Sequence, residues 1–233
     1  MRRQFGTVLA TAGVLAATAA GPAQAAPSGS LPGGVPGAAD GRPPATAEIF
    51  ATNSTATITD PADPRLRTRL TRFDREVRGV IRANGAHAGR STLLDGVYWS
   101  TEHRTTTYER SREFDVGAVS PAGLRHIAAV LAKRYHQESV LTFRRLPRSS
   151  PQANAVDIEA PGVTARGLRA ALAADPAARR RLGGGSVTVD SGRLVLIAPR
   201  KDLALARKFT ARLGVRWKNV TLRYGAEEFV GAG

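Results

Sequence analysis

The order of predicted strands and helices repeats once along this chain, and the repeat constrains the fold more than any single motif does. Residue alternation and β-branched residues predict strands, and apolar residues spaced by three and four predict helices. In the first half the predicted elements are a strand at 48–59, a helix at 63–85, strands at 91–100 and 105–116, a helix beginning at 120 and a strand at 139–143. In the second half they are a strand at 156–160, helical segments at 164–174 and from 175, strands at 186–189 and 194–198, a helix at 203–213 and a strand at 220–224. Both halves therefore have the order β-α-β-β-α-β.

The helix predicted at 63–85 shows the clearest apolar pattern. Asp63 is placed to cap it, Pro64 fits its first turn, and Gly85 ends it. Its apolar side chains share one narrow face when they are wound at about 100° per residue. They are Leu66, Leu70, Phe73, Val77, Val80 and Ile81. We expect this face to lie in the core, with the arginines of the helix in solvent.

The repeated order predicts an α+β protein made of two tandem ferredoxin-like βαββαβ units with antiparallel sheets. The first unit would span 47–145 and the second 155–230, joined by a connector rich in Pro and Ser. In each unit two helices would cover one face of a four-stranded sheet, and the two open faces would be free to pack on each other. A single irregular α+β domain is the alternative.

The first 25 residues have the features of a secretory signal peptide. Two arginines precede an apolar stretch at 5–20, and Ala25 ends a small-x-small cleavage site. A membrane anchor is the alternative, but it needs about 20 continuous apolar residues, and a Gly-Pro pair at 21–22 interrupts the stretch. We expect a secreted, extracellular bacterial protein with a disordered linker at 26–46 and no transmembrane segment.

The run from Ile127 to Leu141 resembles the end of a small secreted bacterial family of ferredoxin-like domains of unknown function. It reads Ile-Ala-Ala-Val-Leu-Ala-Lys-Arg-Tyr-His-Gln-Glu-Ser-Val-Leu. In that family a helix ending in an arginine and an aromatic residue leads through Gln-Glu-Ser-Val-Leu into the final strand, and the family's first strand is similar to Thr46–Phe50. The resemblance covers about 46–145 and implies a secreted α+β domain, without implying a chemistry.

The composition excludes several kinds of site. The chain has no cysteine, which excludes disulfides, thiol catalysis and thiolate metal sites. Its four histidines show no close pairing with carboxylates at helical spacing, so we predict no metal site and no cofactor. The glycine run at 183–185 follows a helix and precedes a strand, whereas a phosphate-binding loop has the opposite order. No serine lies in a Gly-x-Ser-x-Gly motif.

The candidate catalytic residues are His136, Glu138 and Tyr108. His136 and Glu138 stand where the second predicted helix meets a strand, and Tyr108 lies with Glu109 and Glu113 on a strand that can run beside them. A histidine with carboxylates would supply a general base and a proton donor. A structural role is the alternative, because a Gln-Glu-Ser turn satisfies backbone groups at a helix end and a histidine there complements the helix dipole.

Charge is the strongest functional signal, because 34 Lys and Arg outweigh 19 Asp and Glu and give a formal net charge of +15. The basic residues cluster at 65–82, 144–148, 179–181 and 200–208. Such a charge attracts anionic wall polymers, lipid headgroups or nucleic acid, although a compositional bias toward arginine is the alternative. The tryptophans and tyrosines form no ladder among the cations, so we expect no specific nucleic-acid binding.

We therefore expect a secreted, non-enzymatic binding or interaction module whose ligand is an anionic surface, such as a cell-wall polymer, or a protein partner. The alternative is a cofactor-independent enzyme that acts on a small molecule at the open sheet face. A deep cavity between the sheets that contains His136 would favour the enzyme. An interface filled by side chains would favour the binding module.

Overall fold

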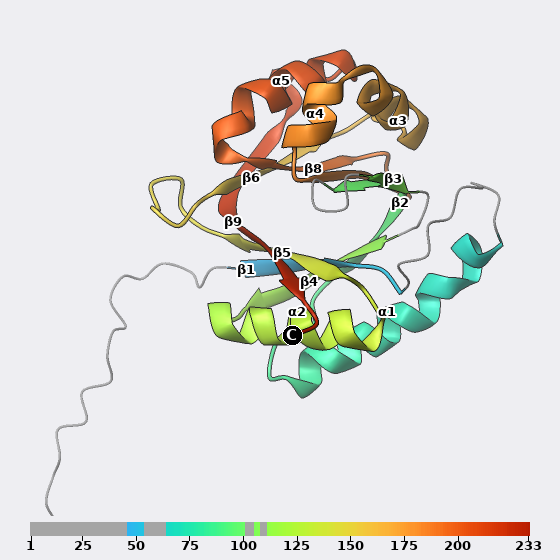
Figure 1. Cartoon of the computed structure of the whole chain (residues 1–233), viewed down its shortest axis with the longest axis vertical. Coiled ribbons are helices and arrows are strands. Elements are labelled where there is room, and N and C mark those ends of the chain that lie inside the picture. The colour runs from blue at the N-terminus through green and yellow to red at the C-terminus, as the bar shows by residue number, and fades with distance from the viewer. Residues whose placement is uncertain (1–45, 54–63, 101–104, 108–110) are drawn as a thin grey trace, which may run out of the picture. The chain divides into compact units, whose positions relative to one another are not determined.

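The structure is a computed structural model that describes residues 46–53, 64–100, 105–107 and 111–233 (Figure 1). The predicted signal peptide, the predicted linker up to residue 45, and Tyr108 lie outside these ranges. Contacts unite the chain from Pro43 to Gly233 into one compact unit.

The secondary structure follows the predicted order closely. The first half contains β1 (Thr46–Ala51), α1 (Arg65–Ala83), β2 (Ser91–Ser100), β3 (Thr105–Thr107), β4 (Ser111–Ala118), α2 (Pro121–Arg134) and β5 (Ser139–Arg145). The second half contains β6 (Ala155–Ala160), α3 (Ala165–Ala174), α4 (Pro176–Arg181), β7 (Gly184–Thr188), β8 (Leu194–Pro199), the 3-10 turn η1 (Arg200–Asp202), α5 (Leu203–Arg212), the 3-10 turn η2 (Trp217–Asn219) and β9 (Thr221–Gly231). The predicted strand at 105–116 is present as β3 and β4, and the last strand continues beyond its predicted end at 224.

The strands close into one antiparallel barrel, so the prediction of two tandem ferredoxin-like units with their own sheets is wrong. Eight strands form a ring in the order β2-β4-β1-β5-β9-β6-β8-β7, in which β7 pairs with β2, and β3 extends the sheet outside the ring. All strand pairs in the described chain are antiparallel. Two sheets that stack face to face would leave four unpaired edges. In the barrel the edges of the two halves pair with each other instead, which removes the edges that would otherwise invite aggregation.

β9 is the strand that joins the two halves. Its first part, Thr221–Gly225, pairs with β6 of its own half. Its second part, Gly225–Gly231, pairs with β5 of the first half, from Arg145 opposite Gly225 to Ser139 opposite Gly231. On the other side of the barrel β2 pairs with β7, with an irregular register between Asp95 and Trp99. Because β9 is long enough to pair with β6 along its first part and with β5 along its second, it joins the two half-sheets on this side of the ring.

Two layers of helices cover the outside of the barrel. α1 and α2 pack on the strands of the first half, with α2 also against β9, and α3, α4 and α5 pack on those of the second, with α3 also against β2 (Figure 1). Each layer has its own apolar core against the outer barrel wall. No helix in the described part of the chain is long and apolar enough to cross a membrane.

The apolar face of α1 lies in the first core, as its spacing predicts. Phe73 is 1% exposed and makes edge-to-face ring contacts with Phe114 of β4, at 5.8 Å between centroids, and with Tyr135 at the end of α2, at 4.8 Å. Leu70 and Val77 are buried beside it. α1 is therefore held by its apolar stripe, which leaves its opposite side to solvent.

The apolar part of the barrel interior is filled by side chains from both halves. Its buried members are Phe50, Leu94, Leu141, Phe143, Ala155, Val195 and Ile197, with Phe229 packed against them. The space that remains among them is about 10 Å³, which is about the volume of one water probe. This part of the barrel is a packed core with no room for a substrate.

Candidate functional site

Two of the three residues predicted as catalytic, His136 and Glu138, line neither of the hollows in the described part of the chain. Both are exposed at the junction of α2 and β5. Glu113, by contrast, is buried. Tyr108 and Glu109 lie outside the described residues, so their place in a site stays untested.

His136 has a structural role at the end of α2. Its φ of 52° makes it the one non-glycine residue with positive φ in the described chain. The next residue, Gln137, donates its backbone N–H to the carbonyl of Ala132 at 2.9 Å, which is the bond that closes a helix end when the residue before it is left-handed. The Gln137 side chain also donates to the carbonyl of Thr52 at 2.6 Å and accepts from the Thr52 N–H at 3.2 Å. The Gln-Glu-Ser turn thus anchors the end of β1.

A cluster of seven charged side chains lies inside the barrel, and we call it the interior charge cluster. Its members are Glu48 (β1), Glu113 (β4), Arg145 (β5), Asp157 and Glu159 (β6), Arg193 (before β8) and Arg223 (β9). The four carboxyl groups belong to residues that are at most 9% exposed. Along the inward positions of β8, the apolar residues Val195 and Ile197 follow Arg193, so the cluster gives way to the apolar interior core.

Ion pairs connect this cluster across the two halves. Arg193 lies 3.6 Å from Glu113 and also contacts Glu159. Arg223 lies 3.2 Å from Asp157 and contacts Glu159 as well. The chain of contacts therefore runs from β4 of the first half to β6 and β9 of the second. A separate pair joins Arg145 to Glu48.

Burial acts to raise the pKa of each of the four carboxyl groups, and their different charged neighbours make the resulting shifts differ. Burial, together with the negative charge of Glu48, raises the pKa of Glu113 to about 7 against the attraction of Arg193. Burial raises the pKa of Asp157 well above its ordinary value, and it also raises that of Glu48. Burial acts in the same direction on Glu159, but the hydrogen bond from Arg193 and the charge of Arg223 outweigh it and lower the pKa. Four carboxyl groups face three guanidinium groups, so a proton held by Glu113 or Asp157 balances the charge.

The ion pairs of this cluster join strands of both halves and so contribute to the cohesion of the barrel. Among the described residues, Glu48 Oε2, Glu113 Oε2 and Asp157 Oδ1 are buried without a hydrogen-bond partner. No group of three or more His, Asp or Glu side chains in the described chain is arranged to hold a metal ion. Of the cluster's four acids, only Glu113 was a candidate from the sequence, and Arg145 was noted as part of the basic cluster at 144–148. Asp157 and Glu159 could have been noticed from the alternation of acids with apolar residues in β6, whose sequence is Ala-Val-Asp-Ile-Glu-Ala.

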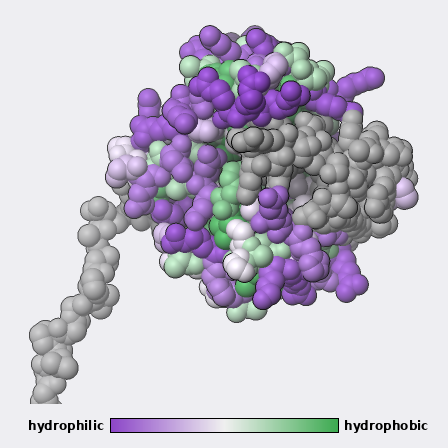
Figure 2. Space-filling view, viewed as in Figure 1, coloured by the Kyte–Doolittle hydropathy of each residue, from purple (hydrophilic) through white to green (hydrophobic). Residues whose placement is uncertain are grey.

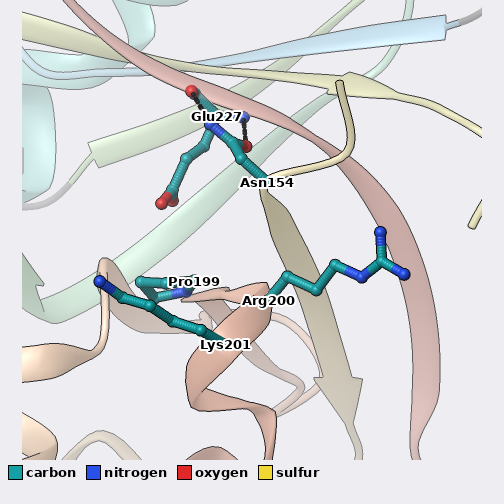
Figure 3. A pocket seen from close by; sticks show the side chains of 5 residues that line it. All are labelled: Asn154, Pro199, Arg200, Lys201 and Glu227. Carbon is teal, nitrogen blue, oxygen red and sulfur yellow. Dashed lines mark hydrogen bonds between the residues drawn. The ribbon is translucent and has the colours of Figure 1, made fainter. Parts of the chain in front are cut away.

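A hollow opens where β6 begins and β8 ends, and we call it the mouth hollow (Figure 3). It measures about 760 Å³ and is lined by Asn154, Pro199, Arg200, Lys201 and Glu227. The Asn154 side chain donates to the backbone carbonyl of Glu227 at 3.1 Å and accepts from its N–H at 2.8 Å. These two bonds fix β9 at this point. The side chain of Glu227 points into the hollow, where burial raises its pKa to about 7.

A smaller groove of about 280 Å³ lies on the outer wall, between the start of α2 and the paired strands β5 and β9. Its polar residues are largely paired. Arg125 lies 3.8 Å from Glu228, and Arg144 donates to Gln152 at 3.0 Å. This pairing leaves little unmatched charge for a ligand.

Ten exposed cations lie on α4, α5 and the turns that flank them, and we call them the basic face. They are Arg179, Arg180, Arg181, Arg200, Lys201, Arg207, Lys208, Arg212, Arg216 and Lys218. The acids in this part of the second helical layer are Asp175 and Asp202, which are buried and already contact Arg212 and Arg181. Figure 2 shows hydrophilic residues over much of this layer.

Aromatic rings hold some of these guanidinium groups in place. Arg207 lies over the ring of Trp217 at 5.5 Å. The ring of Tyr224 has two arginines near it, Arg148 at 5.4 Å and Arg200 at 5.9 Å. These contacts form no aromatic ladder along the sequence, because Arg148, Arg200 and Tyr224 come together only in the fold. A stacked guanidinium keeps its edge free for phosphate or carboxylate.

Comparisons with known proteins leave the functional assignment to the chemistry of these sites. No family model matches the chain, and neither a curated protein nor a solved structure is significantly similar to it. The resemblance of Ile127–Leu141 to a secreted bacterial family therefore stays a prediction.

Proposed function

We propose that this protein is a non-enzymatic binding module that attaches to an anionic polymer through the basic face. The observation that supports this most directly is the imbalance of charge on the second helical layer. The ten exposed cations of the basic face stand against two buried aspartates, each of which already contacts one of those cations. A surface of this kind concentrates polyanions by long-range attraction. With the predicted signal peptide, the polymers it meets would be those outside the cell.

The first helical layer is a less favourable surface for the same ligand. Of its described cations, Arg72 lies 2.6 Å from Glu76, and Arg112 of the adjoining strand lies 3.5 Å from Asp74. The first layer also carries exposed cations, among them Arg75 and Lys133, but on the basic face the two acids, Asp175 and Asp202, are both buried. The attraction of a polyanion should therefore be strongest at α4 and α5.

The packed barrel interior supports binding over catalysis. The space among the apolar interior residues is about 10 Å³, and His136 is exposed at a helix end instead of facing a cavity. An enzyme at an open sheet face would need that face to be accessible, and pairing of the two half-sheets leaves no such face in the described barrel.

The test is a titration of polyphosphate into the full-length protein and two charge-matched variants. The first carries Arg180→Gln, Lys208→Gln, Arg216→Gln and Lys218→Gln on the basic face, and the second carries Arg75→Gln, Arg82→Gln, Arg90→Gln and Lys133→Gln on the first layer. All eight residues are exposed, so both variants should fold. Each exposed contact contributes a fraction of a kcal/mol, so the basic-face variant should lose about tenfold or more in affinity at low salt.

The control variant removes the same net charge and should lose much less. Equal losses in the two variants would show that net charge alone governs binding and would overturn the assignment to α4 and α5. A larger loss in the control would move the site to α1, whose arginines also form a predicted basic cluster. Absence of binding by the wild type would favour a protein partner or an enzyme.

A further inference from the structure

The mouth hollow holds an acidic and a basic side chain that do not meet. The carboxyl group of Glu227 projects from β9 into the hollow, and the side chain of Lys201 projects from η1 along another wall (Figure 3). No ion pair joins them within the described residues, although both line the same space. Arg200 extends in a different direction, toward Tyr224. The gap between Glu227 and Lys201 is thus bounded by an acid and a base.

The carboxyl group of Glu227 lacks a partner on its buried side. Its Oε2 atom is buried and accepts no hydrogen bond from any described residue. Gly183 leaves room for it, since a Cβ at that position would lie 2.9 Å from Oε2. A buried carboxyl oxygen without a donor is costly. The strongest compensating partner is a cationic donor such as an ammonium group, because charge-assisted hydrogen bonds are about twice as strong as neutral ones.

The rim of the hollow is cationic and therefore favours an anionic group of a ligand. Lys201 and Arg200 are exposed there. Neither cation has an acidic partner among the described ion pairs. An ammonium group has three donors and no acceptor, so Lys201 would donate hydrogen bonds to a carboxylate of a ligand. The volume of about 760 Å³ falls within the range of small-molecule sites.

We propose that the mouth hollow binds a small zwitterion, in which an ammonium group and a carboxylate are separated by a short chain. The ammonium group donates to Glu227, and the carboxylate accepts from Lys201. The two hydrogen bonds from Asn154 to the backbone of Glu227 hold the acid in position before the ligand arrives. This site shares Lys201 with the basic face, whereas Glu227 lies outside that face.

The experiment measures binding of ω-amino acids to the full-length protein by calorimetry. β-Alanine, 4-aminobutyrate and 6-aminohexanoate offer the same two end groups at increasing separation. One member of the series should bind at least about tenfold more tightly than butylamine or butyrate, because each half-ligand meets only one of the two charges. Equal affinity for the half-ligands and the zwitterions would overturn the proposal, and so would a failure of all three zwitterions to bind.

Two pairs of variants locate the site. Glu227→Gln should weaken zwitterion binding about tenfold or more through loss of the charge-assisted bond, whereas Glu228→Gln removes the same charge from the next, exposed residue and should not weaken it. Lys201→Gln should weaken binding similarly, with Lys208→Gln on α5 as its control. Unchanged affinity in Lys201→Gln would overturn the assignment even if Glu227→Gln failed to fold. Polyphosphate binding separates this site from the proposed polymer surface. It should weaken in Lys208→Gln, which lies on the basic face, and should not weaken in Glu227→Gln, which lies outside it.

Discussion

The ring of Phe143 lies directly against the backbone of Gly225, at the point where β9 leaves β6 and begins to pair with β5. A Cβ added at Gly225 would lie 2.4 Å from Cζ of Phe143 and 2.5 Å from the carbonyl oxygen of Arg144. No side chain fits at these distances without movement of the neighbouring strand. The joint between the halves of the barrel therefore depends on a glycine at this position.

Gly225→Ala should destabilise the protein by about 1–3 kcal/mol, because overpacking a filled core displaces side chains and backbone. Gly231→Ala is the control in the same strand, where the nearest atom to a new Cβ is the Glu138 carbonyl oxygen at 3.5 Å. Urea denaturation of the two variants measures the difference. Equal stability in Gly225→Ala and wild type would mean that Phe143 does not occupy this place.

Phe73→Ala should cost about 3–5 kcal/mol, as expected for a large buried aromatic residue. Phe73 is 1% exposed and contacts two other rings. Arg75→Ala on the exposed side of the same helix is the control for helix propensity, since it removes no buried surface. A loss below about 1 kcal/mol in Phe73→Ala would place α1 at the periphery.

The raised pKa of Glu113, about 7, makes stability depend on pH. Between the unfolded pKa near 4.5 and the folded pKa, the native state holds a proton that the unfolded state has released, so this group lowers stability as pH rises through that window. Glu113→Gln removes the effect. The free energy of unfolding of this variant, relative to wild type, should rise by up to about 3 kcal/mol between pH 5 and pH 8, because one pKa unit corresponds to about 1.4 kcal/mol.

Glu76→Gln provides a control of opposite sign. Hydrogen bonds from Arg72 and Tyr135 lower the pKa of Glu76, so its contribution is present above the unfolded pKa and is lost as pH falls through the folded one. The stability difference between wild type and Glu76→Gln should therefore shrink toward low pH. Parallel pH profiles for wild type and Glu113→Gln would contradict a buried protonated Glu113.

The mature protein should begin at Ala26, because Ala25 completes the small-x-small cleavage site. Intact-mass measurement of protein from the culture medium checks this. A chain that keeps Met1 would contradict the predicted signal peptide, and with it the expectation that the ligand is extracellular.

Local patterns predicted most helices and strands, but not the closure of the barrel. α1 was predictable because its apolar residues repeat with helical spacing over 16 residues from Leu66 to Ile81. The last strand was predicted to end at Tyr224, whereas β9 continues to Gly231 through Gly225 and the acidic pair Glu227-Glu228, which are poor strand formers. Its continuation depends on pairing with β5, about 80 residues earlier, and no local pattern encodes such a partner.

The interior charge cluster could not be recognised for a related reason. In β6, Asp157 and Glu159 alternate with apolar residues, a pattern typical of a strand with one face in solvent. Helices cover one face of β6 and the barrel interior lies behind the other, so both faces are buried. Their partners Arg193 and Arg223 come from other strands. The polar pattern was visible, but its environment follows from the ring of strands.

The salt dependence of polyanion binding tests the central claim most directly. Titration of polyphosphate into the wild-type protein at several salt concentrations gives the affinity as a function of ionic strength. If the basic face acts by charge attraction, affinity should fall steeply and continuously as salt rises, since exposed charges beyond about 8 Å are screened at physiological ionic strength. Binding should remain measurable near 0.15 M salt. Affinity that does not change with salt, or absence of binding at this ionic strength, would contradict the proposed function.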